Sequence, residues 1–174
     1  MPAFRKRNIL SRHHSGRGFT LIEALISVAI IGIIFTVGPS IFIQVNRFVV
    51  LNKARIELQR EARTALSLMN RNLRQAQVNT IVLDQAANQP YYSRITFTRS
   101  DGVTFCFYQQ GTSLMMSTSN TTQELSENLR YLAFVPQSTE DLSIISVSLT
   151  MEKSIYEAKT KALHMASEKV MVMN

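Results

Sequence analysis

The sequence Gly-Phe-Thr-Leu-Ile-Glu, residues 18–23, opens the apolar stretch that decides the fold of this chain. The stretch extends from Phe19 to Ile43, and Glu23 is its only ionisable side chain. A charged side chain near the centre of a bilayer costs roughly 2.5 kcal/mol or more, so an acid at this depth indicates a function and requires a partner. The partner of Glu23 is therefore the question that the sequence poses.

The apolar stretch is long enough to cross a membrane as a helix. Its 25 residues, at about 1.5 Å each, exceed the hydrocarbon core of roughly 30 Å. A secretory signal peptide has a shorter apolar region, about 7 to 15 residues, before a small-residue cleavage site. Here Pro39 crowds the best such site, near Gly38. A buried helix of a soluble protein is the alternative, but few soluble folds hide so long an uncharged segment. The sequence predicts a transmembrane helix over residues 19–43.

The positive charge of the chain is concentrated before this helix. The formal net charge is +7, and five basic residues with no acid precede Gly18; without residues 1–18, 14 basic and 12 acidic side chains remain. Residues 75–174 carry seven basic and nine acidic side chains, so nucleic-acid binding is not favoured. Basic residues are retained in the cytoplasm, which places the N-terminus there, although basic residues also follow the span. Glu57 and Glu61 offset part of the positive charge that follows the span.

The helical pattern continues beyond the membrane segment without a break signal. Apolar residues recur at spacings of three or four and share one face: Leu58, Ala62, Ala65, Met69, Leu73 and Ala76. Four arginines lie largely on other faces: Arg60, Arg63, Arg71 and Arg74. The pattern predicts one helix from Phe19 to Val78, with residues 44–78 as its amphipathic continuation. The arginines are typical of a solvated or subunit-facing surface rather than of a ligand site.

Residues 79–174 show short alternating runs that are typical of strands. An Asp101-Gly102 turn between two such runs predicts a hairpin. The predicted strands cover residues 93–99, 103–107, 112–117, 128–135 and 142–151. The end of the chain fits two structures, because Ile155, Ala158, Ala162 and Met165 suit a helix whereas Val170–Met173 suits a closing strand. The sequence predicts an α+β fold in which a long N-terminal helix packs on an antiparallel β-sheet.

The sequence does not favour an enzyme. Cys106, the single cysteine, lies in a strand-like run, where a packed thiol is expected rather than a reactive one. His13 and His14 precede Gly18, and His164 stands alone, near no obvious acid or cysteine pair. Glu140-Asp141 is expected in a solvated loop and lacks the spacing of metal ligands. No triad, metal cluster or phosphate loop is apparent, so we predict no catalytic residues, no metal and no cofactor.

The residues around Glu23 resemble a known signature. A short basic leader, Gly-Phe-Thr-Leu-Ile-Glu and the following Ala-Leu-Ile-Ser-Val-Ala-Ile-Ile-Gly look like the N-terminus of type IV prepilins and pseudopilins, over roughly residues 16–40. The resemblance implies that a prepilin peptidase cuts between Gly18 and Phe19, removes the cytoplasmic leader 1–18 and methylates the Phe19 amine. Gly18 would let an extended backbone enter the cleft of that enzyme.

The same resemblance implies a partner for Glu23. In a filament, Glu23 of one subunit would face the Phe19 amine of a neighbour, and this ion pair would fix the axial register of the packed spans. Two alternatives stay open: pairing with the Phe19 amine of the same chain, one turn away, and a position at the headgroup boundary where water solvates the acid. Pro39 predicts a helix kink near Val37–Gly38. It is either a bending point in the filament or an ordinary membrane-helix proline.

Residues 55–174 resemble, with fewer matching features, the minor pseudopilins of the J type and the larger minor pilins. The features are Arg60–Arg63, the Phe97–Phe107 hairpin and the terminal apolar strand, and the two C-terminal cysteines common in major pilins are absent. The resemblance implies a single-pass protein of the inner membrane, with its sheet domain outside the cytoplasm, that enters a type IV pilus or type II secretion pseudopilus at low copy or at the tip.

The partners implied are other pilin or pseudopilin subunits, prepilin peptidase, the inner-membrane assembly platform and membrane lipid. The residues do not distinguish pilus, secretion and competence systems, which share this N-terminal motif. The alternative function is a binding module, anchored by one helix, for adhesion or DNA uptake. In that module Tyr91 and Tyr92 would contact the ligand, although packing at a sheet edge explains them equally well.

Overall fold

The computed structural model describes residues 18–138, 141–156 and 160–173. It contains one long helix, α1 (Leu21–Leu73), a short 3-10 helix, η1 (Val78–Thr80), and eight strands in two antiparallel sheets. The predicted α+β fold is therefore confirmed. The chain divides into two compact units, with the boundary between Asn46 and Arg47. Most of the predicted leader, and Glu140 and Ala158 of the predicted loop and C-terminal helix, lie outside the described residues.

In the first unit, α1 is apolar on all sides. Among the described residues, α1 is the one helix long and apolar enough to cross a membrane; its 18-residue window has a mean hydropathy of 2.4, and none of that window is buried within the chain. A core helix of a soluble domain would be mostly buried by its own fold. The described part of the chain therefore leaves this surface to be covered by lipid or by other molecules.

In the second unit, one face of α1 forms the helix side of the core. The buried positions follow the spacing of three and four residues that the sequence predicted: Ala54, Leu58, Ala62, Ala65, Leu66, Met69 and Leu73. Ala76, just beyond the helix, is also fully buried. The amphipathic pattern thus identified the correct face of the helix.

The helix ends earlier than predicted. It stops at Leu73 rather than Val78. The amide of Ala76 still bonds to the Leu73 carbonyl at 3.0 Å, but the amide of Gln77 donates to the Thr98 carbonyl at 2.9 Å. Pairing with the end of a strand therefore replaces the helical bonds that would continue α1. This competition depends on residues far along the chain, so the local pattern could not show it.

The first sheet has the order β1-β2-β3-β4-β5. Its strands are β1 (Val82–Asp84), β2 (Arg94–Thr98), β3 (Thr104–Gln110), β4 (Ser113–Thr118) and β5 (Thr122–Ser126). The predicted hairpin is confirmed: Phe97 lies opposite Phe105, and Gly102 in the connecting turn has φ +83°, which glycine adopts readily. The two outer strands were missed, because β1 has only three residues and β5 is mostly polar and exposed.

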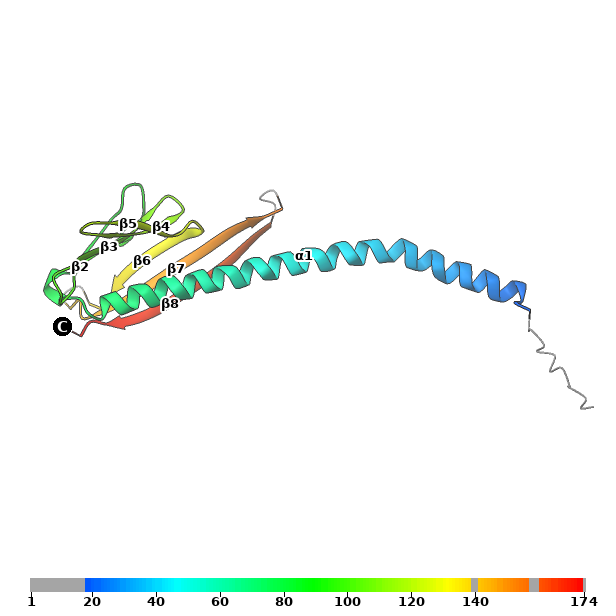
Figure 1. The fold of residues 1–174 in the computed structure, drawn as a ribbon, viewed down its shortest axis with the longest axis horizontal. Coiled ribbons are helices and arrows are strands. Elements are labelled where there is room, and N and C mark those ends of the chain that lie inside the picture. Colours follow the sequence, from blue (N-terminus) through cyan, green and yellow to red (C-terminus); the bar gives the residue numbers. More distant parts are fainter. Residues whose placement is uncertain (1–17, 139–140, 157–159, 174) are drawn as a thin grey trace, which may run out of the picture. The chain divides into compact units, whose positions relative to one another are not determined.

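The second sheet has the order β6-β7-β8 and lies beside the second half of α1 (Figure 1). Its strands are β6 (Leu129–Pro136), β7 (Ile144–Ile155) and β8 (Thr160–Met171). The ambiguous C-terminal segment is a strand, paired with β7 from Ile155↔Thr160 to Ile144↔Met171. The sequence predicted one sheet, but the structure has two. β6 pairs with β7 and does not pair with a strand of the first sheet.

Both sheets contribute to one hydrophobic core with α1. Three phenylalanines of the predicted hairpin stack there: the Phe97 ring centroid lies 5.9 Å from that of Phe105 and 6.2 Å from that of Phe107. Such offset aromatic pairs stabilise a core beyond the area that they bury. From the second sheet, Leu132, Phe134 and Leu149 are fully buried in the same core. Helix and sheets therefore form a single folded unit.

A polar contact links α1 to the connection between the two sheets. The Glu61 carboxylate accepts a hydrogen bond from Ser126 Oγ at 2.7 Å and from Asn128 Nδ2 at 3.1 Å. Ser126 is buried, and its Oγ also accepts from the Asn128 amide at 3.2 Å. One turn earlier in the helix, Glu57 forms a 2.6 Å ion pair with Lys153 of β7. These contacts set which stretch of the sheets lies over which turn of α1.

We expect the Leu58→Ala variant to lose about 2–5 kcal/mol of unfolding free energy, because the side chain is fully buried and its removal leaves a cavity between helix and sheet. The matched control is Ile56→Ala on the same helix, where the side chain is 51% exposed. The control should stay within about 0.5 kcal/mol of the parent. Denaturant unfolding of the full chain in detergent, followed by circular dichroism, measures both; equal losses would contradict the predicted core face.

Candidate processing and assembly site

Glu23 is hydrogen-bonded at the start of its own helix. Its Oε2 atom accepts from the Thr20 amide at 2.9 Å and from the Thr20 hydroxyl at 2.9 Å. In return, the Glu23 amide donates to Thr20 Oγ1 at 3.3 Å. The Thr20 carbonyl accepts from the Ala24 amide at 3.2 Å, which makes Thr20 the N-cap of α1. Thr20 and Glu23 therefore form a capping box, in which each side chain satisfies a backbone N–H of the other.

The capping box has two consequences for the acid. First, it supplies hydrogen bonds within the chain, and the positive end of the helix dipole favours a negative group in the first turn. Second, it uses one carboxylate oxygen, since no described residue donates to Glu23 Oε1. Glu23 can therefore bind a cation through Oε1 while it caps its own helix. This contact was not predicted, although Thr-x-x-Glu before an apolar run is its sequence signal.

Gly18 and Phe19 lie directly before the capped helix, and both are exposed. A Cβ atom added at Gly18 would meet no heavy atom within 4 Å. The chain itself therefore does not require glycine at this position. The Phe19 side chain is 75% exposed, so nothing in the described chain covers the predicted new N-terminus.

The hydroxyl side chains of the apolar segment bond to their own helix. Ser27 Oγ donates to the Glu23 carbonyl at 2.7 Å, and Thr36 Oγ1 donates to the Gly32 carbonyl at 2.8 Å. These bonds remove the cost of placing free hydroxyls in lipid. α1 is continuous through Pro39, and Ser40 Oγ donates to the Val37 carbonyl at 2.7 Å. The kink at Pro39 stays a prediction.

The other candidate residues do not form a site. Cys106 is half-buried on β3, where it accepts a hydrogen bond from Thr96 Oγ1 at 3.4 Å. His164 lies on β8 opposite Met151. Within residues 18–138, 141–156 and 160–173, no group of three His, Cys, Asp or Glu side chains lies close enough to hold a metal ion.

These features define a class of protein. A capped helix with an uncovered apolar segment, continued by a half that packs on antiparallel sheets, is the architecture of a pilin-like subunit. Residues 14–38 match the family model described as "Prokaryotic N-terminal methylation motif", so the chain carries the signature of type IV prepilins and pseudopilins. Comparison with curated proteins and with solved structures gave no match.

We expect Thr20→Val and Glu23→Gln to affect the helix start differently. Valine removes the capping hydroxyl, so the amides of the first turn should exchange with solvent about five-fold faster. Glutamine keeps an oxygen that can accept from the Thr20 amide, so Glu23→Gln should leave this exchange within about two-fold of the parent. Hydrogen exchange of the full chain in micelles measures both variants. Unchanged exchange in Thr20→Val would contradict the capping box.

Proposed function

We propose that this chain is a minor pilin or pseudopilin, a structural subunit that is processed by prepilin peptidase and assembled into a type IV pilus or a type II secretion pseudopilus at low copy or at the tip. The observation that carries the proposal is the methylation motif at the start of a capped apolar helix. The resemblance of residues 55–174 to minor subunits supports the low-copy role.

Cleavage between Gly18 and Phe19 would create the cation that Glu23 lacks. It replaces an amide with a protonated amine at Phe19, in surroundings where charge–charge attraction is stronger than in water. The free Oε1 atom of Glu23 can accept a bond from that amine on a neighbouring subunit. The attraction would offset the desolvation of both charges and fix how far one span is shifted along the next.

The proposed partners follow from the uncovered helix. Residues 19–43 contact lipid before assembly and the spans of other subunits after it. The N-terminus lies in the cytoplasm with prepilin peptidase and the assembly platform at the inner membrane, and the sheets lie outside the cytoplasm. We expect this chain to contribute no catalytic group and no cofactor to its processing or assembly.

Processing is tested with two glycines of the leader. Gly18→Val should stop cleavage, because a branched side chain would enter the cleft of the peptidase, whereas Gly16→Val should be cleaved as the parent is. The open space around Gly18 means that the substitution does not disturb the chain itself. Intact-mass spectrometry should find the mature parent starting at Phe19 with one added methyl group. A parent that still starts at Met1 in cells with active peptidase would refute the proposed function.

Assembly is tested by separating the charge of Glu23 from its capping role. Glu23→Gln keeps the cap and removes the charge, so incorporation into sheared filaments should fall by about ten-fold or more. Thr20→Val keeps the charge and weakens the cap, so incorporation should stay within about three-fold. Immunoblots of the filament fraction against total processed subunit measure both. Normal incorporation of Glu23→Gln would rule out the intersubunit ion pair.

The second candidate function is a binding module anchored by one helix. Its supporting observation is Tyr92, which has φ +63°, a conformation that costs energy for a bulky residue. The Tyr92 carbonyl accepts from the Phe134 amide at 2.8 Å, and the neighbouring Tyr91 side chain is 77% exposed. A module of this kind would keep its function when residues 1–43 are replaced by an unrelated membrane anchor, whereas a filament subunit would lose it.

A further inference from the structure

The second half of α1 carries a line of basic side chains on the face opposite the core. At 3.6 residues per turn, these positions share one side of the helix and extend over about 30 Å. They form what we call the basic stripe: Lys53, Arg60, Arg63, Arg71 and Arg74. All five residues are exposed. The buried Leu58 and Met69 lie on the other side, against the sheets.

The basic stripe combines five neighbouring cations that have no partner in the described part of the chain. The cations of the sheets are mostly ion-paired: Arg94 with Asp84, Arg99 with Asp101, Arg130 and Lys161 with Glu152, and Lys153 with Glu57. The five side chains of the stripe have no ion pair or hydrogen bond with any residue that the structure describes. Positive charge therefore accumulates along the helix.

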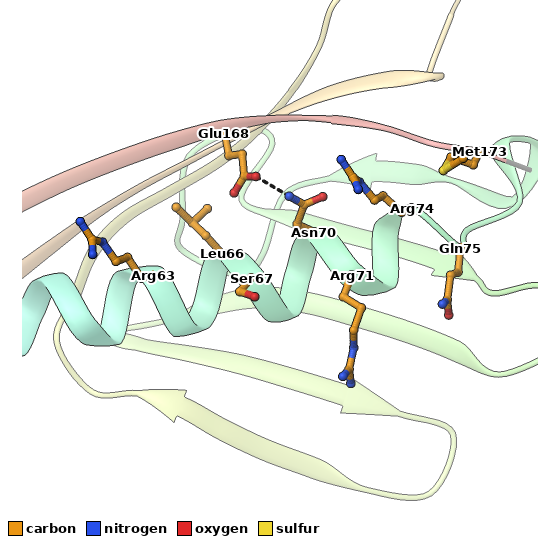
Figure 2. A pocket seen from close by; sticks show the side chains of 9 residues that line it. All are labelled: Arg63, Leu66, Ser67, Asn70, Arg71, Arg74, Gln75, Glu168 and Met173. Carbon is orange, nitrogen blue, oxygen red and sulfur yellow. Dashed lines mark hydrogen bonds between the residues drawn. The ribbon is translucent and has the colours of Figure 1, made fainter.

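A groove borders the stripe between α1 and β8. Its volume is about 660 Å³, and its lining includes Arg63, Asn70, Arg74 and Glu168. In Figure 2, Arg63, Asn70 and Arg74 lie on the β8 side of the helix, whereas the side chain of Arg71, at the far edge of the stripe, extends away from β8. A ligand in the groove would therefore meet two guanidinium groups at once, with Ser67 on the turn between them.

Asn70 gives the groove a second requirement. Its Nδ2 donates to the Glu168 carboxylate, which can only accept, and this fixes the orientation of the amide. The Oδ1 atom is buried and has no hydrogen-bond partner among the described residues. A buried acceptor without a donor is unfavourable by about 1–3 kcal/mol. The two arginines of the groove therefore favour a ligand that offers carboxylates, and an N–H donor that reached Asn70 Oδ1 would remove this cost.

We propose that the basic stripe and its groove bind an acidic polypeptide segment of a different neighbouring subunit; this inference rests on the proposed function. A peptide supplies both requirements, because its acidic side chains bind guanidinium groups in bidentate geometry and its backbone amides are donors. A phosphodiester chain supplies only acceptors along its backbone. The groove thus favours a peptide over the phosphate backbone of DNA.

The charges of this chain argue against a second copy as the partner. Among the described residues, only Glu124 and Glu127 are carboxylates without an ion pair or hydrogen bond. Within the described residues, two free acids face the five free cations of the stripe, so their use would leave most of the stripe unpaired. A subunit with an acidic surplus matches the stripe better, and charge complementarity of this kind gives specificity between different subunits.

The test uses the full chain in detergent with a photo-crosslinking amino acid at Ser67, an exposed position inside the stripe. The probe is biotinylated poly-L-glutamate, and the control position for the crosslinker is the exposed Thr122 on β5. Crosslinking reports on the local surface, so binding to the basic leader does not interfere. We expect the yield at Ser67 to exceed that at Thr122 by about ten-fold.

Two double variants with the same change in net charge sharpen the test. Arg63→Glu/Arg74→Glu should lower the yield at Ser67 by about ten-fold, whereas Arg55→Glu/Lys169→Glu, at exposed positions off the stripe, should change it by less than about two-fold. Circular dichroism checks folding, and Arg63→Gln/Arg74→Gln replaces the first variant if it unfolds. Equal losses in the two variants would show an effect of net charge alone and overturn the proposal.

Competition and capture in cells decide the class of partner. Unlabelled poly-L-glutamate should displace the probe, and stronger displacement by duplex DNA or phosphatidylglycerol vesicles at equal charge would overturn the proposal. In cells, the segment crosslinked to Ser67 should be an acidic stretch of another subunit, and capture of this same chain would overturn it. Cleavage at Gly18 is measured in the same cells: an uncut chain that still crosslinks refutes the proposed function, and a cut chain without the crosslink refutes this inference alone.

Discussion

Coverage of apolar helix surface is the constraint on which this structure depends. In the second unit, a narrow apolar face of α1 is covered by the chain itself, because Leu58, Met69 and Leu73 pack against two sheets. In the first unit, apolar side chains surround the helix and no described residue covers them. The hydrophobic effect acts equally on both halves. The fold covers the apolar face of the second half, and the described chain leaves the first half uncovered.

The two halves of α1 also treat charge differently. In the first half, a single acid is tied to Thr20 at the helix start, and the hydroxyls bond back to helix carbonyls. In the second half, Glu57 and Glu61 face the sheets and are held by Lys153, Ser126 and Asn128. The helix cations remain free on the outer face. One continuous element thus presents an uncovered apolar surface, a surface covered by its own sheets and an exposed basic surface.

Local patterns in the sequence were sufficient for much of this structure. Spacings of three and four found the buried face of α1, and alternation around Asp101-Gly102 found the hairpin of Phe97 and Phe105. What they missed depends on distant pairing. The helix end at Leu73 depends on Thr98, and the contact of Glu61 with Ser126 joins residues 65 positions apart. The sequence left the C-terminal segment open between a helix and a strand, because its apolar side chains fit the spacing of both. Only its pairing with β7 shows that it is a strand.

The residues of the candidate site that are close in sequence were predicted, and those that are brought together only by folding were not. The motif around Gly18 and Glu23 is contiguous, so it was visible at once, and a family model matches it. The free Asn70 acceptor and the groove beside β8 join segments about a hundred residues apart, and only the folded chain brings them together. The capping role of Thr20 was not predicted, although Thr20 and Glu23 are only three residues apart, because Thr20 lies within the apolar stretch.

The hydrogen bonds between Thr20 and Glu23 have a consequence for how a subunit would be added to and lost from the proposed filament. In a single chain, the carboxylate already accepts two hydrogen bonds from Thr20. In the proposed filament, docking would add one charged contact to an acid that already has these hydrogen bonds. The free-energy gain for each added molecule would then be modest, so the addition of a subunit would be readily reversible.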